Sequence, residues 1–369
     1  MAARGNTIAQ AFSNKVMAEV YERTLMDQII NRDYEGEINA VGSKINVLNF
    51  DRVAEKTYTG ADLTADSLTE NNMALTIDQY KSFYWKEKTL DNWLSYIKDP
   101  HPTIVSQVAE ERSRNMDEFI FGLYADVGAG NRVGTNYTTG TVAVAVTTGV
   151  VTGSGTTFTS AMVGRGFKAT GHTKWYRVKT FTSTTSITIE DDKDDATSAY
   201  TGGTISAGAT FTIEANTPVS VTTSNLLQQI SNLKQKLDEV DSYDLNGSPE
   251  SDRWLIVPPV FENTLVRSTG VQLHVPAVYE ELIKRGFITE LQGFKVFKSN
   301  RLTGNNTDGY RILAGHPGWM TFAEKVLDAR MEEDLIGNFG SAYKDLFVYG
   351  AKVMDSRRHF AAELYATFA

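Results

Sequence analysis

The sequence predicts an α+β protein whose chain is interrupted by a small all-β domain. Before residue 136 and after residue 217, helical and strand periodicities alternate. Between these positions Thr, Ser, Gly and Val dominate in short alternating runs such as TVAVAVTT and TSITIE, which indicate a β-sandwich or barrel. The chain has no Asp or Glu from Val127 to Ile189 and no proline between Pro102 and Pro218, so its composition changes sharply there.

Composition and motifs exclude most enzyme classes. The 369 residues carry a net charge of −9, which argues against a protein that coats nucleic acid by neutralising phosphates. There are no cysteines, so disulfides, thiolate metal sites and cysteine nucleophiles are excluded, and the five histidines lie far apart. No phosphate-binding, nucleophile-elbow or metalloprotease motif occurs. We therefore predict no catalytic residue, metal or cofactor.

The sequence shows no targeting segment. The first residues, MAARGNTIAQAFSNKVMAEV, lack the apolar core of a signal peptide. No stretch approaches the roughly 20 apolar residues of a membrane-spanning helix. We expect a chain that is soluble and folds in the cytosol.

The N-terminal region predicts an amphipathic helix over residues 8–30. Phe12, Val16 and Val20 follow helical spacing, and Met17 and Tyr21 repeat the same spacing one residue further along the helix. Such a helix docks on its own core or reaches a neighbouring subunit, and the spacing alone leaves both open.

Residues 44–90 predict a long two-stranded hairpin. KINVLNF alternates apolar and polar residues, and MALTIDQYKSFYWKEKT carries Leu75, Ile77, Phe83 and Trp85 on one face. The connection between them is long and polar, which is typical of a functional segment that projects from the body. An ordinary surface loop is the alternative.

The remaining elements follow from periodicity and turn residues. A long amphipathic helix is predicted over 103–126, ended by the glycines of GAG at 128–130. Helices are also predicted in TTSNLLQQISNLKQKLDEV, FENTLVRS and HPGWMTFAEKVLDA. Strands are predicted in DRWLIVPP, GFKVFKS, YRILAG, DLFVYGAKVMD and HFAAELYATFA.

One aromatic cluster is a candidate ligand site. Lys174, Trp175 and Arg177 could form a stacking face for a sugar or nucleic acid. Strand alternation places Tyr176 on the opposite face from Trp175, so we expect one of the two rings to pack in the core.

Two polar clusters are interpreted as solvated surface. EDDKDD at 190–195 predicts a solvated turn, because its spacing differs from that of a calcium-binding loop. His359 and Glu363 stand four residues apart beside two arginines, which indicates a solvated face rather than a metal site.

A series of phrases, taken in order, resembles the major capsid proteins of tailed bacteriophages with the HK-97-type fold. The phrases are KINVLNFDRVAEKTYTGADLT, LTIDQYKSFYWKEKT, RWLIVPPVFENTLV, GFKVFKSNRL, ILAGHPGWMTFAEKV and LFVYGAKV. The resemblance implies six segments: an N-arm with a helix (1–43), an E-loop hairpin with flanking strands (44–90), a P-domain spine helix (91–135), an inserted all-β domain (136–217), an A-domain (218–310), and the A-domain end with the return to the P-domain (311–369).

The same resemblance implies a structural subunit rather than an enzyme. Copies of the chain would assemble into hexamers and pentamers of an icosahedral head enclosing double-stranded DNA, made in the host cytoplasm and located in the virion. Implied partners are the chain itself, portal and scaffolding proteins and a decoration protein; DNA would be contacted weakly and non-specifically, and no membrane is involved. No scaffolding-like segment is seen, so a separate scaffold or none is expected.

The resemblance also suggests assembly contacts in the N-arm and E-loop. The candidate residues are Phe12, Val16, Tyr21, Lys56, Tyr58, Asp62 and Asp66. Covalent crosslinking is not predicted, because no carboxylate catalyst accompanies Lys56. An adhesive or glycan-binding protein acting through the Thr-rich domain is the alternative function, and an enzyme with an unrecognised site is disfavoured.

Overall fold

The computed structural model describes residues 14–20, 24–25, 29–32, 44–50, 70–88, 101–192, 198–239, 251–268, 290–332, 339–353 and 355–369. The chain divides into two compact units, which are Met1–Met116 with Met320–Met354, and Asp117–Trp319 with Asp355–Ala369. Within the described ranges, no helix has the length and apolar character needed to cross a membrane.

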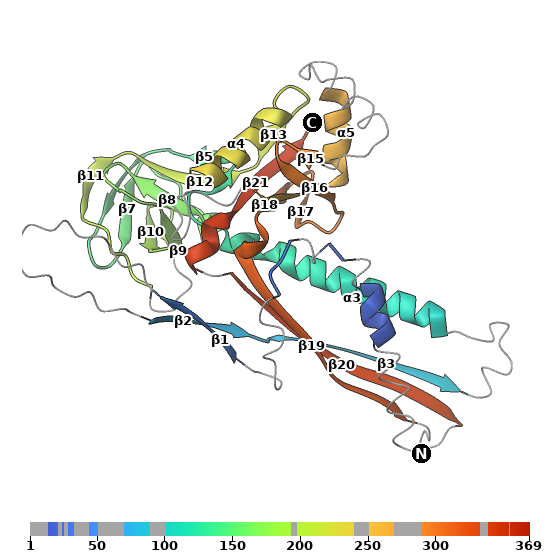
Figure 1. Ribbon diagram of the computed structural model, residues 1–369. Helices are drawn as coiled ribbons and strands as arrows, with labels where there is room; N and C mark the ends of the chain where they lie inside the picture. The colour runs from blue at the N-terminus through green and yellow to red at the C-terminus, as the bar shows by residue number, and fades with distance from the viewer. Residues whose placement is uncertain are drawn as a thin grey trace, which may run out of the picture. The chain divides into compact units, whose positions relative to one another are not determined.

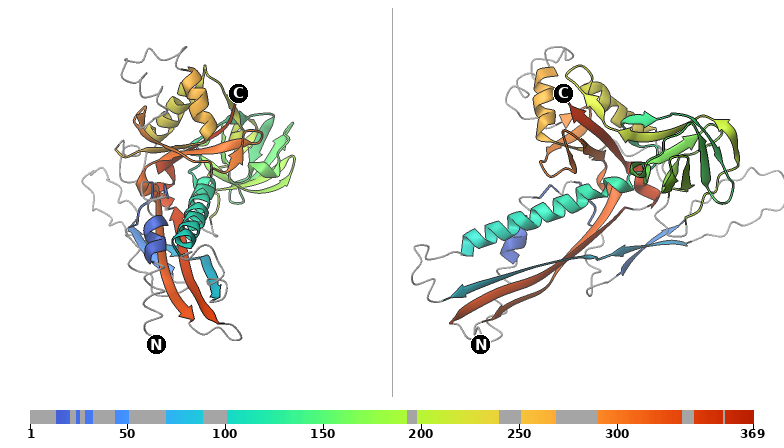
Figure 2. Two further views of the ribbon diagram at one scale, coloured as in Figure 1. Left: turned by 90° about the vertical axis from the view of Figure 1, so that its right-hand side faces the viewer. Right: turned by 180° about the vertical axis from the view of Figure 1, so that it is seen from behind.

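A three-stranded antiparallel sheet forms the first unit's framework (Figures 1 and 2). Its strands, in spatial order, are β19 (Met320–Glu332), β20 (Gly340–Val353) and β3 (Gln79–Lys88). The helix predicted in HPGWMTFAEKVLDA is therefore wrong, because this stretch is a 3-10 turn, η5 (Pro317–Trp319), followed by β19. Its Ala, Glu, Lys and Leu favour helix locally, but β19 pairs with β20 along almost its whole length, and that pairing decides the structure.

The predicted hairpin is present as strands β1 (Lys44–Phe50) and β2 (Glu70–Thr76). They pair antiparallel from Lys44 opposite Thr76 to Phe50 opposite Glu70, and the connection between them lies outside the described residues. The second predicted strand is divided in two, because β2 pairs with β1 whereas β3 pairs with β20. Leu75 and Ile77 are fully buried in a cluster with Ala323 and Val348.

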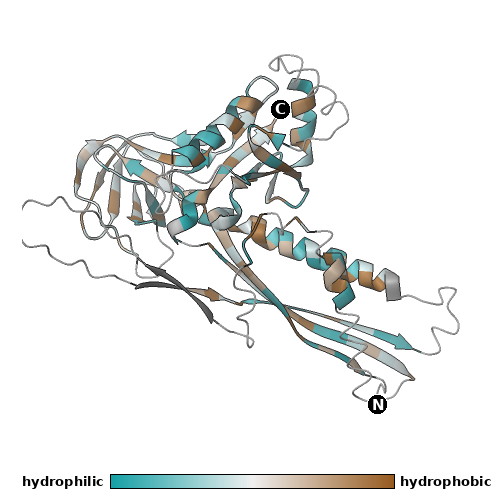
Figure 3. Ribbon diagram, in the orientation of Figure 1, coloured by the Kyte–Doolittle hydropathy of each residue, from teal (hydrophilic) through white to brown (hydrophobic). Residues whose placement is uncertain are grey.

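Helix α3 (His101–Gly122) confirms the predicted long helix, and a 3-10 turn, η3 (Leu123–Asp126), continues it. Arg112 joins the helix to the sheet of the first unit, because its guanidinium pairs with Asp345 and both side chains are buried. The same guanidinium lies over the rings of Phe83 and Phe347, at 5.4 Å and 4.9 Å from their centroids. Helix α3 and helix α4 (Leu226–Asp238) both carry hydrophilic and hydrophobic residues (Figure 3), as expected of amphipathic helices.

The N-terminal helix is shorter than predicted where the structure describes it. Residues 14–20 are helical, but 24–25 and 29–32 are not. Asn31 instead forms a parallel bridge with Thr321 of β19, so its backbone is extended. Val16 and Val20 are fully buried, and Arg112 Nη1 lies 3.8 Å from Met17 Sδ, so this helix packs within its own chain.

The second unit contains a mixed sheet covered by two helices. The helices are α4 (Leu226–Asp238) and α5 (Pro259–Ser268), as predicted. The main strands, in spatial order, are β13 (Val219–Val221), β21 (Ala361–Phe368), β18 (Gly309–Gly315), β14 (Trp254–Val257), β16 (Phe294–Lys298) and β15 (Glu290–Leu291). Two short strands join them, β4 (Arg132–Val133) beside β21 and β17 (Gly304–Asn305) beside β18. A 3-10 turn, η6 (Asp355–Phe360), precedes β21, so the predicted terminal strand begins later than expected.

The Thr-rich segment forms an eight-stranded sheet. Its order is β11 (Ile205–Ala209), β6 (Thr141–Val144), β7 (Val150–Ser154), β10 (Ser186–Glu190), β9 (Tyr176–Ser183), β8 (Gly166–Ala169), β12 (Phe211–Thr217) and β5 (Thr135–Tyr137), with a 3-10 turn, η4 (Ser160–Met162), between β7 and β8. Only Thr210 separates β11 from β12, so the chain links the two sides and the sheet curls round a core. We call it the Thr-rich barrel. Tyr176 is only 3% exposed in that core, which confirms that one of the two adjacent rings is core.

Candidate functional site

The predicted assembly residues fall mostly where the structure gives no description. Phe12, Tyr21, Lys56, Tyr58, Asp62 and Asp66 all lie outside the described residues. Val16 is described and is fully buried against its own chain. A contact between Val16 and a neighbouring subunit would therefore require the helix to leave this position.

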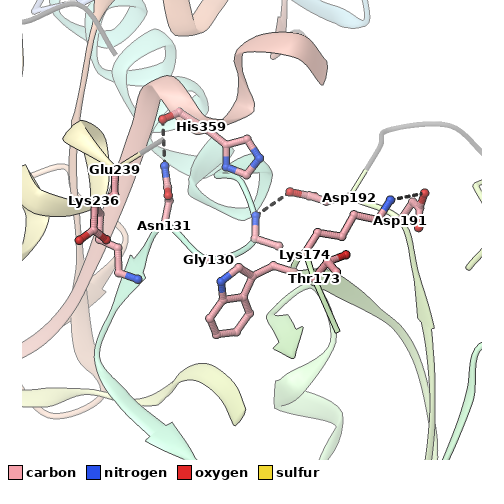
Figure 4. A pocket seen from close by; sticks show the side chains of 11 residues that line it. Gly130, Asn131, Thr173, Lys174, Asp191, Asp192, Lys236, Glu239 and His359 are labelled. Atoms are coloured by element: carbon pink, nitrogen blue, oxygen red, sulfur yellow. Dashed lines mark hydrogen bonds and ion pairs between the residues drawn. The ribbon is translucent and has the colours of Figure 1, made fainter. Parts of the chain in front are cut away.

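The predicted ligand residues Lys174 and Trp175 line a pocket of about 470 Å³ in the second unit (Figure 4). They come directly before β9, and the opposite wall is the end of helix α4, with Lys236 and Glu239. The turn Ala129–Asn131 and His359 complete the pocket, with Thr173, Asp191 and Asp192. Arg177 is not among the lining residues, so the structure brings together two of the three predicted residues. We call this the Trp175 pocket.

Gly130 makes room for the indole of Trp175. It has φ of +99°, a conformation that glycine adopts without strain. A Cβ at this position would lie 2.6 Å from Trp175 Cδ1. Lys168 Nζ lies 5.9 Å from the centre of the indole ring. A second hollow of about 280 Å³ shares Trp175, Lys236 and Glu239 with the first, so the indole borders both.

Residues 190–192 of the acidic run are partly or fully buried, which corrects the interpretation as a solvated turn for this part, and 193–195 lie outside the described residues. Asp191 is only 6% exposed and lies 2.9 Å from Lys174 Nζ. Burial alone would raise the pKa of the Asp191 carboxyl, but hydrogen bonds from Lys174 and Thr201 outweigh it and lower that pKa. Asp192 accepts hydrogen bonds from Ala129 N and Arg358 Nη1. Over the residues with described positions, no cluster of His, Asp or Glu is arranged to hold a metal ion.

A buried cluster of charges connects the Thr-rich barrel to the mixed sheet. Glu363 of β21 is fully buried and contacts Arg132 Nε at 3.0 Å, Arg165 Nη1 at 3.1 Å and Arg311 Nη1 at 2.7 Å. The expectation that Glu363 lies on a solvated face is therefore wrong. The sequence interpretation failed because the arginines that contact Glu363 come from segments distant in the sequence.

Glu214 of β12 is the second acid of this cluster. Its carboxylate accepts hydrogen bonds from Arg132 Nη1 at 3.0 Å and from the backbone N–H groups of Gly130 and Gly166 at 2.8 and 2.9 Å. Complete burial raises the pKa of Glu214 even against the attraction of Arg132. Burial also tends to raise the pKa of Glu363, but three arginines outweigh it and lower that pKa.

His359 borders the Trp175 pocket without belonging to the charge cluster. Burial is the main cause that lowers the pKa of its imidazole; the charge of Asp192 opposes it, and the charges of Arg358 and Arg132 lower the pKa further. The imidazole is therefore neutral at pH 7. Asp191 and Asp192 are paired with Lys174 and Arg358, so these two carboxylates hold the wall of the pocket in place.

Comparison with solved structures finds a shared fold at low sequence identity. A structure titled "Mycobacterium phage Che8" has a TM-score of 0.55 and 17% identity, over 94% of this chain and 90% of that chain. The capsid structure of the cyanophage P-SCSP1u has a TM-score of 0.53 and 15% identity, over 94% and 89%. The mature capsid of bacteriophage PhiM1 has a TM-score of 0.51 and 11% identity, over 93% and 87%. The chain has the fold of bacteriophage capsid proteins. No protein-family model matches its sequence, and no curated protein does.

Within this capsid fold, sequence reasoning missed the charge cluster entirely. Each of its two acids is the single charged residue in an otherwise largely apolar strand, Glu214 in FTIEA and Glu363 in AAELYATF. Arg132 follows a glycine-rich turn that we interpreted only as the end of a helix. A single charge within a buried strand was the available signal, since such a residue is rarely buried unless it is paired.

Proposed function

We propose that this chain is the structural subunit of a bacteriophage head, and that its copies assemble into hexamers and pentamers of an icosahedral shell around double-stranded DNA. The capsid fold carries the proposal, because the likeness extends over almost the whole chain and not over one domain. The same likeness favours a structural rather than an enzymatic role. It lends no support to the alternative of an adhesive protein.

The described elements suit the parts of an HK-97-type subunit. Helix α3 has the length of a spine helix, and β1 with β2 matches the base of an E-loop. The sheet of β19, β20 and β3 with α3 would form the P-domain, and residues 218–310 most of the A-domain. The Thr-rich barrel would be a domain inserted between spine helix and A-domain.

Exposed aromatic side chains on the first unit support subunit contacts. Tyr80 and Tyr84 of β3 are 47% and 52% exposed, and Phe339, directly before β20, is 90% exposed. Large aromatic groups left in water favour burial against another surface. Many such contacts, each weak, give a closed lattice high collective stability.

The other proposed partners follow from the role. Portal, scaffolding and decoration proteins would contact the shell from the virion and during assembly in the host cytoplasm. DNA would be held weakly, because a chain with net charge −9 has little capacity to neutralise phosphates.

Shortening the hairpin tests the assembly role. Residues 53–67 are replaced by a two-residue Asn-Gly turn, which leaves strands β1 and β2 intact. A second variant carries a Gly/Ser segment of the original length. Negative-stain microscopy is expected to show shells for the unaltered chain only, while both variants remain folded by circular dichroism. Intact shells from the shortened variant would refute the role of the hairpin.

A further inference from the structure

We propose that the Trp175 pocket binds a neutral saccharide. The inference goes beyond the proposed assembly function and does not depend on it. It rests on three features of the pocket, which are its aromatic wall, the polar groups left without partners and the balance of charge.

The aromatic wall is a tryptophan held in place by its surroundings. Trp175 is part-exposed, and its indole lies against Gly130, where any side chain would collide with the ring. An indole face carries partial negative charge and attracts the slightly positive C–H groups on the flat side of a sugar ring. Binding pockets of this kind combine one apolar wall with a few placed polar groups.

Several polar groups around this wall have no partner in the described part of the chain. They are the indole N–H of Trp175, the ammonium of Lys236, the hydroxyl of Thr173 and the imidazole of His359. Glu239 accepts one hydrogen bond, from Gln235 Nε2 at 2.5 Å, on Oε1 only. Donors and acceptors are thus both available, as a ligand with several hydroxyl groups requires.

The charges of the pocket disfavour a charged ligand. Lys174 is paired with Asp191, and Asp192 is paired with Arg358. Among the described residues, this leaves Lys236 and Glu239 as the lining charges without an ion pair, one of each sign. A nucleic acid or acidic glycan would meet the carboxylate of Glu239, and a cation would meet the ammonium of Lys236. A neutral ligand avoids both costs.

The test uses the full, unassembled chain and an array of neutral, sialylated and sulfated oligosaccharides, together with a single-stranded DNA probe. Hits are confirmed by isothermal titration calorimetry, which measures the affinity of every variant, including those that lack Trp175. We expect neutral oligosaccharides to bind, and Trp175→Ala to weaken binding by at least about tenfold, because it removes the aromatic wall. Trp175→Phe is expected to retain part of the affinity, since it keeps an aromatic face.

A pair of lysine variants keeps the proposal falsifiable if Trp175→Ala fails to fold. Lys236→Gln is expected to weaken binding, whereas Lys234→Gln, on the same helix but outside the pocket lining, leaves it unchanged. Three results would overturn the proposal: no neutral glycan bound at millimolar concentration, binding confined to charged glycans or DNA, or equal affinity in all variants. None of these results bears on whether the chain forms shells.

Discussion

Arg165 and Glu363 lie 198 positions apart in the sequence, yet Arg165 Nη1 and Glu363 Oε2 are 3.1 Å apart, with side chains 8% and 0% exposed. Arg165 comes from the Thr-rich barrel and Glu363 from the mixed sheet. Because both charges are withdrawn from water, each depends on the other and on Arg132 and Arg311 for compensation. The barrel is therefore fixed to the mixed sheet by buried charges and not only by the covalent chain.

Removing Glu363 should destabilise the chain strongly. Glu363→Gln leaves three arginines with one fewer buried anion, and we expect a loss of about 3–5 kcal/mol in the free energy of unfolding. Arg165→Met should cost less, because Glu363 keeps Arg132 and Arg311. Urea unfolding of the single and double variants measures the coupling. If the effects of the two substitutions simply add, the two side chains do not act together.

Alanine substitutions at two glycines distinguish the cost of backbone strain from the cost of a steric clash. A Cβ at Gly164 would meet no atom within 4 Å, and the backbone φ of Gly164 is +81°. Gly164→Ala is therefore expected to cost only backbone strain, about 1 kcal/mol in the free energy of unfolding. Gly130→Ala has the same kind of backbone but collides with Trp175, which should add about 1–3 kcal/mol. Thermal unfolding compares the two variants. Adding Trp175→Ala to Gly130→Ala should recover the added loss, and no recovery would mean that the collision is not the cause.

The barrel should lose stability in mild acid through His172. Burial, and secondarily the charge of Lys168, lowers the pKa of this imidazole below its unfolded value of about 6.5. Its Nδ1 accepts a hydrogen bond from Ala169 N–H at 3.2 Å, and its Nε2 lies 2.8 Å from Tyr200 Oη, so a second proton would break the first bond. The unfolded chain then binds more protons, and stability falls as the pH drops from about 6.5 towards the lowered pKa.

Unfolding temperatures at pH 7.5 and 5.5 test this effect. The fall with pH should be smaller in His172→Gln than in the unaltered chain. His316 and His359 also have pKa values lowered by burial, so some acid sensitivity should remain in that variant. An identical fall in both proteins would show that His172 does not contribute.

Arg112 should be intolerant even of lysine. Its planar guanidinium pairs with Asp345 and at the same time covers the rings of Phe83 and Phe347. A lysine ammonium cannot do both, so Arg112→Lys should destabilise the first unit by about 2 kcal/mol or more. Arg114→Lys on the exposed side of the same helix is the control, because its contact with Glu111 is at 3.9 Å and exposed. Similar unfolding midpoints for both variants would contradict the role given to Arg112.

The parts of the fold predicted from sequence are those with strong local signals. Helix α4 repeats apolar residues at helical spacing, and Leu226, Ile230, Leu233 and Leu237 are all buried. From Phe83 to Lys88 of β3, the odd-numbered residues are likewise less exposed than the even ones, as alternation predicts. Strand β19 was missed because its residues favour helix, and its pairing with β20 is a long-range property.

The site was predicted only in part for the same reason. Trp175 and Lys174 were predicted as ligand residues because an aromatic and a basic residue are adjacent there. The wall of the pocket opposite them comes from helix α4. The separation of Lys174 and Lys236 in the sequence does not indicate that both residues line one pocket. The charge cluster was missed because five residues from five separate strands or turns compose it.

Electron microscopy of the purified full chain, alone and with a scaffolding protein, shows directly whether its copies form a shell. We predict closed icosahedral shells built from hexamers and pentamers of this subunit. Monomers or dimers as the sole species under both conditions would contradict it.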